Sequence, residues 1–131
     1  MNTYSYDEFK KTDAYKTFIS ENSGIGKIKI RATAARGALP VSGVNVVISK
    51  IIEDYNVVFY EGITDESGMI SCISLPVPSI DLKDDLVIPP SSIYVLDIKD
   101  NDISSSYDIR VYDGICTMQN ISVVPKTGGD L

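Results

Sequence analysis

The stretch Lys27-Ile28-Lys29-Ile30-Arg31-Ala32 indicates the fold class of this 131-residue chain. Basic and apolar residues alternate strictly along it, as in a β-strand that has one face in solvent and the other on a core. The composition agrees, because 18 Ile and 12 Val stand against 6 Leu. β-branched side chains fit a pleated sheet and crowd a helix. The sequence therefore predicts an all-β protein.

Six further strands are expected downstream, separated by turns rich in Gly, Pro, Asp and Asn. They cover residues 44–50, 57–63, 69–75, 93–99, 107–112 and 115–124. Residues 76–92 hold four prolines and predict a long loop between the fourth and fifth strands. Asp113-Gly114 is typical of a hairpin turn, so the last two strands are expected to pair with each other. Together the seven strands predict a seven-stranded antiparallel Greek-key sandwich.

The N-terminal 22 residues contain the only predicted helix, which is expected to be short or broken near Thr12. Ser5 and Glu8 match a capping box at its start. The chain is therefore divided into a helical leader (1–23), a β-sandwich domain (24–125) and a flexible tail (126–131). Because a sandwich leaves edge strands with unpaired backbone groups, we expect the leader to cover such an edge, in its own subunit or in a second copy.

Several classes of protein are disfavoured by composition. The chain has no His, the commonest general base and zinc ligand. Its net charge is −6 and its pI about 4.5, which argues against a nucleic-acid partner. No apolar run is long enough to span a membrane. The polar, acidic start is no signal peptide, so we expect the chain to be cytoplasmic when synthesised.

No metal and no cofactor is expected either. The acidic residues around Asp100 fail the spacing of a calcium loop, because Ser105 stands where Gly is needed and Val111 where Glu is needed. The two cysteines, Cys72 and Cys116, cannot by themselves complete a four-ligand zinc site. We expect them to be reduced and buried, and a disulfide between them is the alternative.

The order of turns and strands resembles a known family. The segments that carry the resemblance are Leu39-Pro40-Val41-Ser42-Gly43-Val44-Asn45-Val46, Thr64-Asp65-Glu66-Ser67-Gly68 and Ile93-Tyr94-Val95-Leu96-Asp97-Ile98. They are similar to the carboxypeptidase regulatory-like, or transthyretin-like (prealbumin-like), β-sandwich, although Val44 replaces the usual Ala. The resemblance covers residues 24–125. Hydroxyisourate hydrolase, an enzyme of this fold, depends on histidines, so for this chain we expect no enzymatic activity.

A narrower resemblance concerns Ser74-Leu75-Pro76-Val77-Pro78 and the segment 111–120. Both look like parts of non-catalytic modules in clostridial-type cell-envelope proteins, which occur with spore cortex-lytic enzymes and in phage products. The resemblance implies a Gram-positive spore, wall or phage-particle context.

The expected function is a non-catalytic binding or assembly module, a structural or adaptor component of a spore, cell wall or phage-like particle. The alternative is a regulatory accessory or inhibitor that docks on a wall-lytic enzyme or a protease. A protein partner is expected, with cell-wall glycan or self-association through the leader as alternatives. Candidate contacts are aromatic residues expected outside the strands and the basic stripe: Tyr4, Tyr6, Phe9, Tyr55, Lys27, Lys29 and Arg31. For the stripe, the competing interpretation is a solvated face paired with neighbouring acids.

Overall fold

The computed structural model describes residues 1–80, 89–100 and 103–123. The predicted tail, 126–131, lies outside these residues, as does the middle of the loop predicted at 76–92. Nine strands and two short helices occur in the described part of the chain. They are β1 (Asn2–Ser5), α1 (Tyr6–Phe9), α2 (Asp13–Glu21), β2 (Gly24–Ala34), β3 (Leu39–Pro40), β4 (Asn45–Ile52), β5 (Tyr55–Ile63), β6 (Met69–Val77), β7 (Ser91–Asp100), β8 (Ile103–Tyr112) and β9 (Cys116–Ser122).

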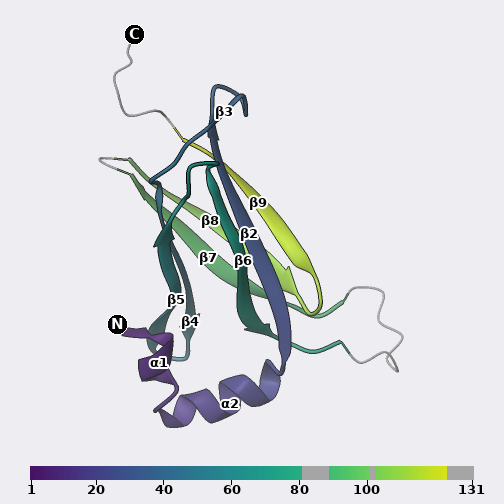
Figure 1. Cartoon of the computed structure of the whole chain (residues 1–131). Coiled ribbons are helices and arrows are strands. Elements are labelled where there is room, and N and C mark those ends of the chain that lie inside the picture. The colour runs from purple at the N-terminus through teal and green to yellow at the C-terminus, as the bar shows by residue number, and fades with distance from the viewer. Residues whose placement is uncertain (81–88, 101–102, 124–131) are drawn as a thin grey trace.

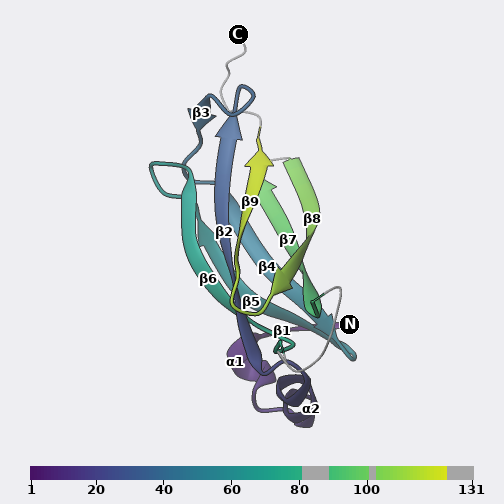
Figure 2. The same ribbon diagram turned by 90° about the vertical axis from the view of Figure 1, so that its right-hand side faces the viewer.

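The strands form two sheets that face each other. The first sheet has the order β1-β5-β4-β7-β8, and the second is built on β2, which pairs with β3, β6 and β9. Figure 2 shows β2 with β6 on one side and β9 on the other. The predicted all-β class is confirmed. Nine strands replace the expected seven, and the two additions are β1 and β3.

The last strand departs from the predicted hairpin. β9 pairs in parallel with β2 in the second sheet, whereas β8 belongs to the first sheet. The turn between them explains the change of sheet. The two carboxylate oxygens of Asp113 accept hydrogen bonds from the backbone N–H groups of Ile25 and Ile80, both at 3.0 Å. Gly114, at a φ of 75°, donates to the carbonyl of Ile25. The turn is thereby tied to the beginning of β2, and the chain continues along that strand.

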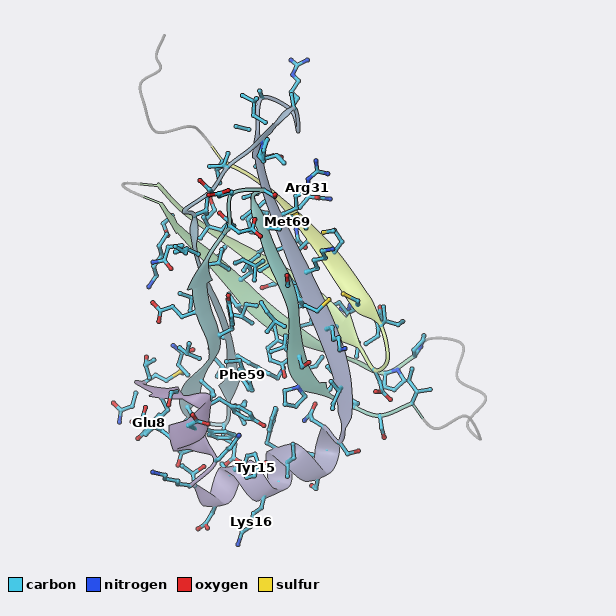
Figure 3. The ribbon with its side chains drawn as sticks, in the orientation of Figure 1. Glu8, Tyr15, Lys16, Arg31, Phe59 and Met69 are labelled. Atoms are coloured by element: carbon cyan, nitrogen blue, oxygen red, sulfur yellow. The ribbon has the colours of Figure 1, made fainter. Side chains whose placement is uncertain are left out.

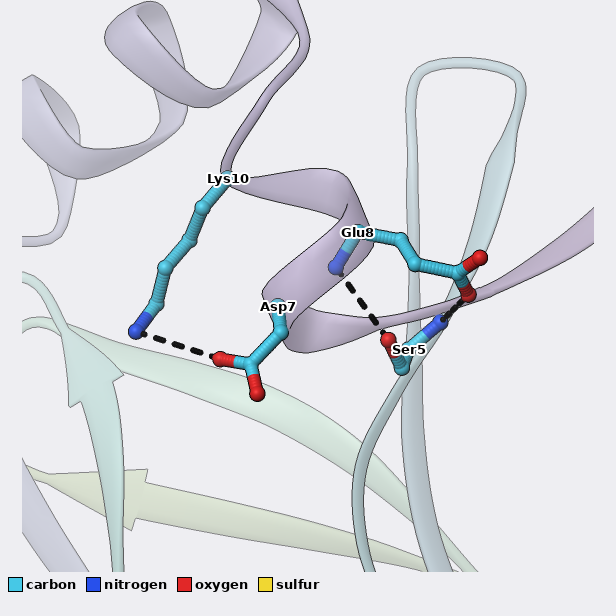
Figure 4. A network of polar contacts seen from close by, with 4 residues as sticks. All are labelled: Ser5, Asp7, Glu8 and Lys10. Carbon is cyan, nitrogen blue, oxygen red and sulfur yellow. Dashed lines mark hydrogen bonds and ion pairs between the residues drawn. The ribbon is translucent and has the colours of Figure 1, made fainter.

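The leader is part of the first sheet. β1 pairs in parallel with β5, so the leader covers an edge strand of its own chain, one of the two expected arrangements. The capping box is confirmed, since Glu8 N–H donates to the Ser5 hydroxyl and Ser5 N–H donates to the Glu8 carboxylate (Figure 4). The helix is broken between Phe9 and Asp13, where the Thr12 hydroxyl donates to the Phe9 carbonyl.

The core has two parts. The larger lies between the sheets and includes Ile28 and Ile30 of β2 and Leu96 of β7, all fully buried. The smaller lies where the helices cover one end of the sandwich, and it is centred on Phe9 and Phe18 (Figure 1). The helices are thus held by aromatic packing on the sheet as well as by β1.

Candidate functional site

The basic stripe lies on the outer face of the second sheet. Lys27 and Arg31 are exposed and Lys29 is half-buried, whereas Ile28 and Ile30 between them are fully buried. The predicted alternation is therefore confirmed residue by residue. The sheet presents one apolar face to the core and one cationic face to solvent.

The neighbours of the stripe on both flanking strands carry no charge. The register places Lys27 between Ser74 of β6 and Cys116 of β9. Arg31 lies beside Met69 on one side (Figure 3) and beside Asn120 on the other, and Lys29 lies beside Met118. Among the described residues the only ion pair joins Lys10 and Asp7 (Figure 4), so within that part of the chain the stripe is not paired with acids. We call the stripe with these neighbours the basic face.

The basic face also exposes apolar side chains. Ile25, which precedes Lys27 on the same side of β2, is 58% exposed, and Met118 is 45% exposed. Exposed apolar groups beside unpaired cations are typical of interaction surfaces, because contact with a partner removes the first from water and neutralises the second.

The aromatic candidates gather elsewhere, beneath the helices. The ring of Tyr55 on β5 lies 5.1 Å from that of Tyr4 and 5.5 Å from that of Phe9. Tyr4 and Tyr55 lie on strands, contrary to the expectation that they fall outside them. Phe9 is 0% exposed, so its side chain is not available to a partner in this structure. Tyr4, Phe9 and Tyr55 therefore belong to a packed aromatic cluster that attaches the leader to the sandwich.

Sequence reasoning did not assign three further members of this aromatic cluster. Tyr15 and Phe18 come from α2, and Phe59 comes from β5 (Figure 3). The ring of Phe59 is 4.6 Å from that of Tyr6 and 5.1 Å from that of Tyr94 in the main core. β1 pairs with β5, and this pairing holds the leader beside the strand that carries Phe59.

The buried phenol of Tyr6 is expected to make the fold less stable in alkaline solution. Burial, followed by the neighbouring Tyr15, raises the pKa of Tyr6 from 10.0 to about 12. The neutral phenol is therefore favoured in the folded state. The raised pKa stabilises the folded state fully below pH 10.0. This stabilisation is lost as the pH rises towards 12, because Tyr6 loses its proton at a lower pH in the unfolded chain than in the folded one. In urea unfolding across this window, Tyr6→Phe should lose less stability than the wild type. Equal losses would contradict the assignment.

An apolar groove connects the aromatic cluster with the basic face. It has a volume of about 410 Å³ and lies where the end of α2 meets β2 and β6. Its walls include Tyr6 of the aromatic cluster, Ile25 and Ser74 beside the basic face, and Ile19 of α2. The groove thus extends the apolar part of the basic face around the end of the sandwich.

The structure corrects the expectation of buried cysteines. Cys72 on β6 and Cys116 on β9 are both exposed and carry free thiols, and their Sγ atoms are 3.2 Å apart. The strict alternation of β2 does not extend to β6, because the ladder between these strands shifts register near Cys72. The expectation of burial treated both cysteines as small apolar residues and took no account of this shift.

Lys50 is a half-buried cation that is held by contacts within the first sheet. Its Nζ donates to the Ile93 carbonyl at 2.9 Å and lies 5.2 Å from the centre of the Tyr94 ring. Burial lowers the pKa of Lys50. The carbonyl and the ring face both favour the charged form, so they offset part of this desolvation.

In the described residues, no group of three or more Cys, Asp or Glu side chains could hold a metal ion. Within the same residues, neither helix is long and apolar enough to cross a membrane.

Comparison with known proteins gives a likeness of low sequence similarity among solved structures. No family model matches the chain, and no curated protein sequence does. Among solved structures, the chain is similar to 5-hydroxyisourate hydrolase of Klebsiella pneumoniae, with 17% sequence identity and a TM-score of 0.46. The likeness covers 74% of this chain and 84% of the hydrolase. At this level it assigns no reaction, substrate or partner to this chain.

The expectation that the chain has no enzymatic activity is corrected by this comparison. It rested on the missing histidines and on the dependence of one enzyme of the fold on them. A solved structure to which the chain is similar is itself an enzyme. The expectation that the chain lacks enzymatic activity is therefore dropped, and no particular reaction is assigned to the chain.

Proposed function

We propose that this chain is a binding or assembly module whose basic face docks on an acidic partner protein. The observation that carries the proposal is the uniform surroundings of the stripe: the described neighbours of Lys27, Lys29 and Arg31 on β6 and β9 are uncharged. Cations without acid partners raise the local potential and attract an anionic surface. The exposed Ile25 and Met118 add apolar contact area beside them.

The proposed setting is a structural or adaptor role in a spore, cell wall or phage-like particle. It is supported by the resemblance of residues 74–78 and 111–120 to modules of such assemblies, and by the transthyretin-like turn motifs at 39–46 and 64–68. We propose the transthyretin-like type for the sandwich on the same motifs. Finding the chain by peptide mass spectrometry in purified spores or phage-like particles of the source strain supports this setting, and its absence from both contradicts it.

The basic face is tested by neutralising it. Immobilised polyglutamate serves as the acidic protein probe, and purified peptidoglycan as the glycan probe. Lys27→Gln, Lys29→Gln and Arg31→Gln together should weaken binding to polyglutamate roughly 10-fold or more, since three charge contacts at the surface contribute up to about 1 kcal/mol each. Binding of the wild type should also fall as salt is raised.

The matched control changes the same charge elsewhere. Lys11→Gln, Lys16→Gln and Lys99→Gln replace three exposed lysines distant in sequence from the stripe. This variant also loses three positive charges, but it should bind polyglutamate within about twofold of the wild type. Equal weakening by both variants would show that net charge alone is measured. Retention on peptidoglycan but not on polyglutamate would replace the protein partner by wall glycan.

A further inference from the structure

The two thiols of the chain meet on the outside of the second sheet. Cys72 belongs to β6 and Cys116 to β9, and β2 runs between these strands. Both residues are exposed, yet their Sγ atoms are only 3.2 Å apart. Two cysteines 44 positions apart in sequence are thus brought into contact across a third strand.

The register explains how the thiols reach each other. Cys116 lies directly opposite Lys27 of β2. On the other side, Ile73 lies opposite Ile28, and the ladder then shifts before Ile70 meets Ile30. Cys72 therefore falls within a β-bulge, and a bulge redirects the side chain it contains.

We propose that Cys72 and Cys116 form a reversible modification site, which a low-molecular-weight disulfide such as oxidised glutathione closes to an intramolecular disulfide across β2. The pair lies within the basic face, since Cys116 is opposite Lys27, but the proposal does not rest on the partner proposed for that face. Because both thiols are exposed, a small disulfide can reach them without unfolding of the core.

The reaction balances as thiol–disulfide exchange. One thiolate of the pair attacks a sulfur of the low-molecular-weight disulfide, which forms a mixed disulfide and releases one thiolate. The second cysteine, as thiolate, then attacks the protein sulfur of that mixed disulfide, forms the Cys72–Cys116 bond and releases the other thiolate. The chain loses two electrons and two protons, and the reagent becomes two thiols.

The surroundings control the rate of this exchange. The hydrogen bond with Cys72 is the largest of the effects that raise the pKa of Cys116, and the charges of Lys29 and Lys27 oppose them. The neighbours of the pair on β6 and β9 are uncharged, among them Ser74 and Met118. Since the thiolate is the nucleophile, closure should be faster in alkaline than in neutral solution.

The bond should be easily reduced. A disulfide usually joins Cα atoms about 4.4–6.8 Å apart. Strands on the two sides of β2 are separated by two spacings of about 4.8 Å each. Closure must therefore draw β6 and β9 together across β2, and strained, exposed disulfides have more oxidising potentials than structural ones. We expect the bridge to reopen in excess reduced glutathione.

Intact-protein mass after treatment with oxidised glutathione tests the proposal. The wild type should lose two hydrogens and keep no glutathione, and dithiothreitol should restore its mass. Cys72→Ser and Cys116→Ser should each stop at the mixed disulfide and retain one glutathione, because the resolving thiol is missing. Circular dichroism of both variants confirms that the exposed substitutions leave the fold intact.

Three outcomes would overturn the proposal. A wild type that retains two glutathiones, or forms covalent dimers, would show that the thiols do not resolve each other. A wild type that stays unmodified while both serine variants also stay unmodified would show that the thiols are not accessible. A bridge that resists excess reduced glutathione would contradict its assignment as reversible.

Discussion

Replacing Phe9 by alanine is expected to lower the free energy of unfolding by about 3–5 kcal/mol, the usual cost of truncating a buried Phe. Phe9 is 0% exposed, and its ring lies within 6.1 Å of the rings of Tyr15, Phe18 and Tyr55. These three come from α2 and β5, so the truncation leaves a cavity at the point where the leader meets the sandwich. Urea unfolding followed by circular dichroism measures the loss.

Two matched variants locate the effect. Phe9→Leu keeps most of the buried volume and should lose clearly less stability than Phe9→Ala. Tyr4→Ala removes an aromatic ring from the same leader, but from a partly exposed position on β1, and should also lose less. If Phe9→Ala loses no more than Tyr4→Ala, the cluster does not hold the leader in solution.

The local parts of this fold could be predicted from the sequence because local physics decides them. The alternation from Lys27 to Ala32 assigns the faces of β2, and the capping pair Ser5 and Glu8 begins α1 where it was expected. The six other strands appear with ends shifted by a few residues, because a ladder extends as far as its partner allows. β1 and β3 are short and have little pattern of their own, so only their pairing with β5 and β2 reveals them.

The pairing of strands that are far apart in sequence could not be predicted, because it depends on which sheet each strand joins. Asp113-Gly114 has the residues of a hairpin turn, yet Asp113 bonds to Ile25 and Ile80 and directs β9 to β2. That pairing brings Cys116 across from Lys27, and the bulge of β6 turns Cys72 towards it. Neither contact has a periodic signal. The basic face was predictable as a stripe, but the absence of charged neighbours on β6 and β9 required the register.

Removal of residues 1–22 is expected to have a still larger effect than Phe9→Ala. It takes away β1, which pairs with β5, and with it the whole helical cover of Val57 and Ile52. The truncated chain then exposes an unpaired strand edge next to apolar side chains, a combination that promotes association between edges. We expect a lower melting temperature and self-association, measured by thermal unfolding and light scattering.

A shorter truncation separates the two causes. Removing residues 1–4 opens most of the β5 edge but leaves Phe9 and Phe18 in place, so the apolar end stays covered. If edge pairing dominates, this variant should self-associate like the longer truncation. If apolar cover dominates, it should remain monomeric with a small loss of melting temperature, as the complete burial of Phe9 leads us to expect. A chain without residues 1–22 that stays monomeric and melts like the wild type would show that the leader does not stabilise the sandwich.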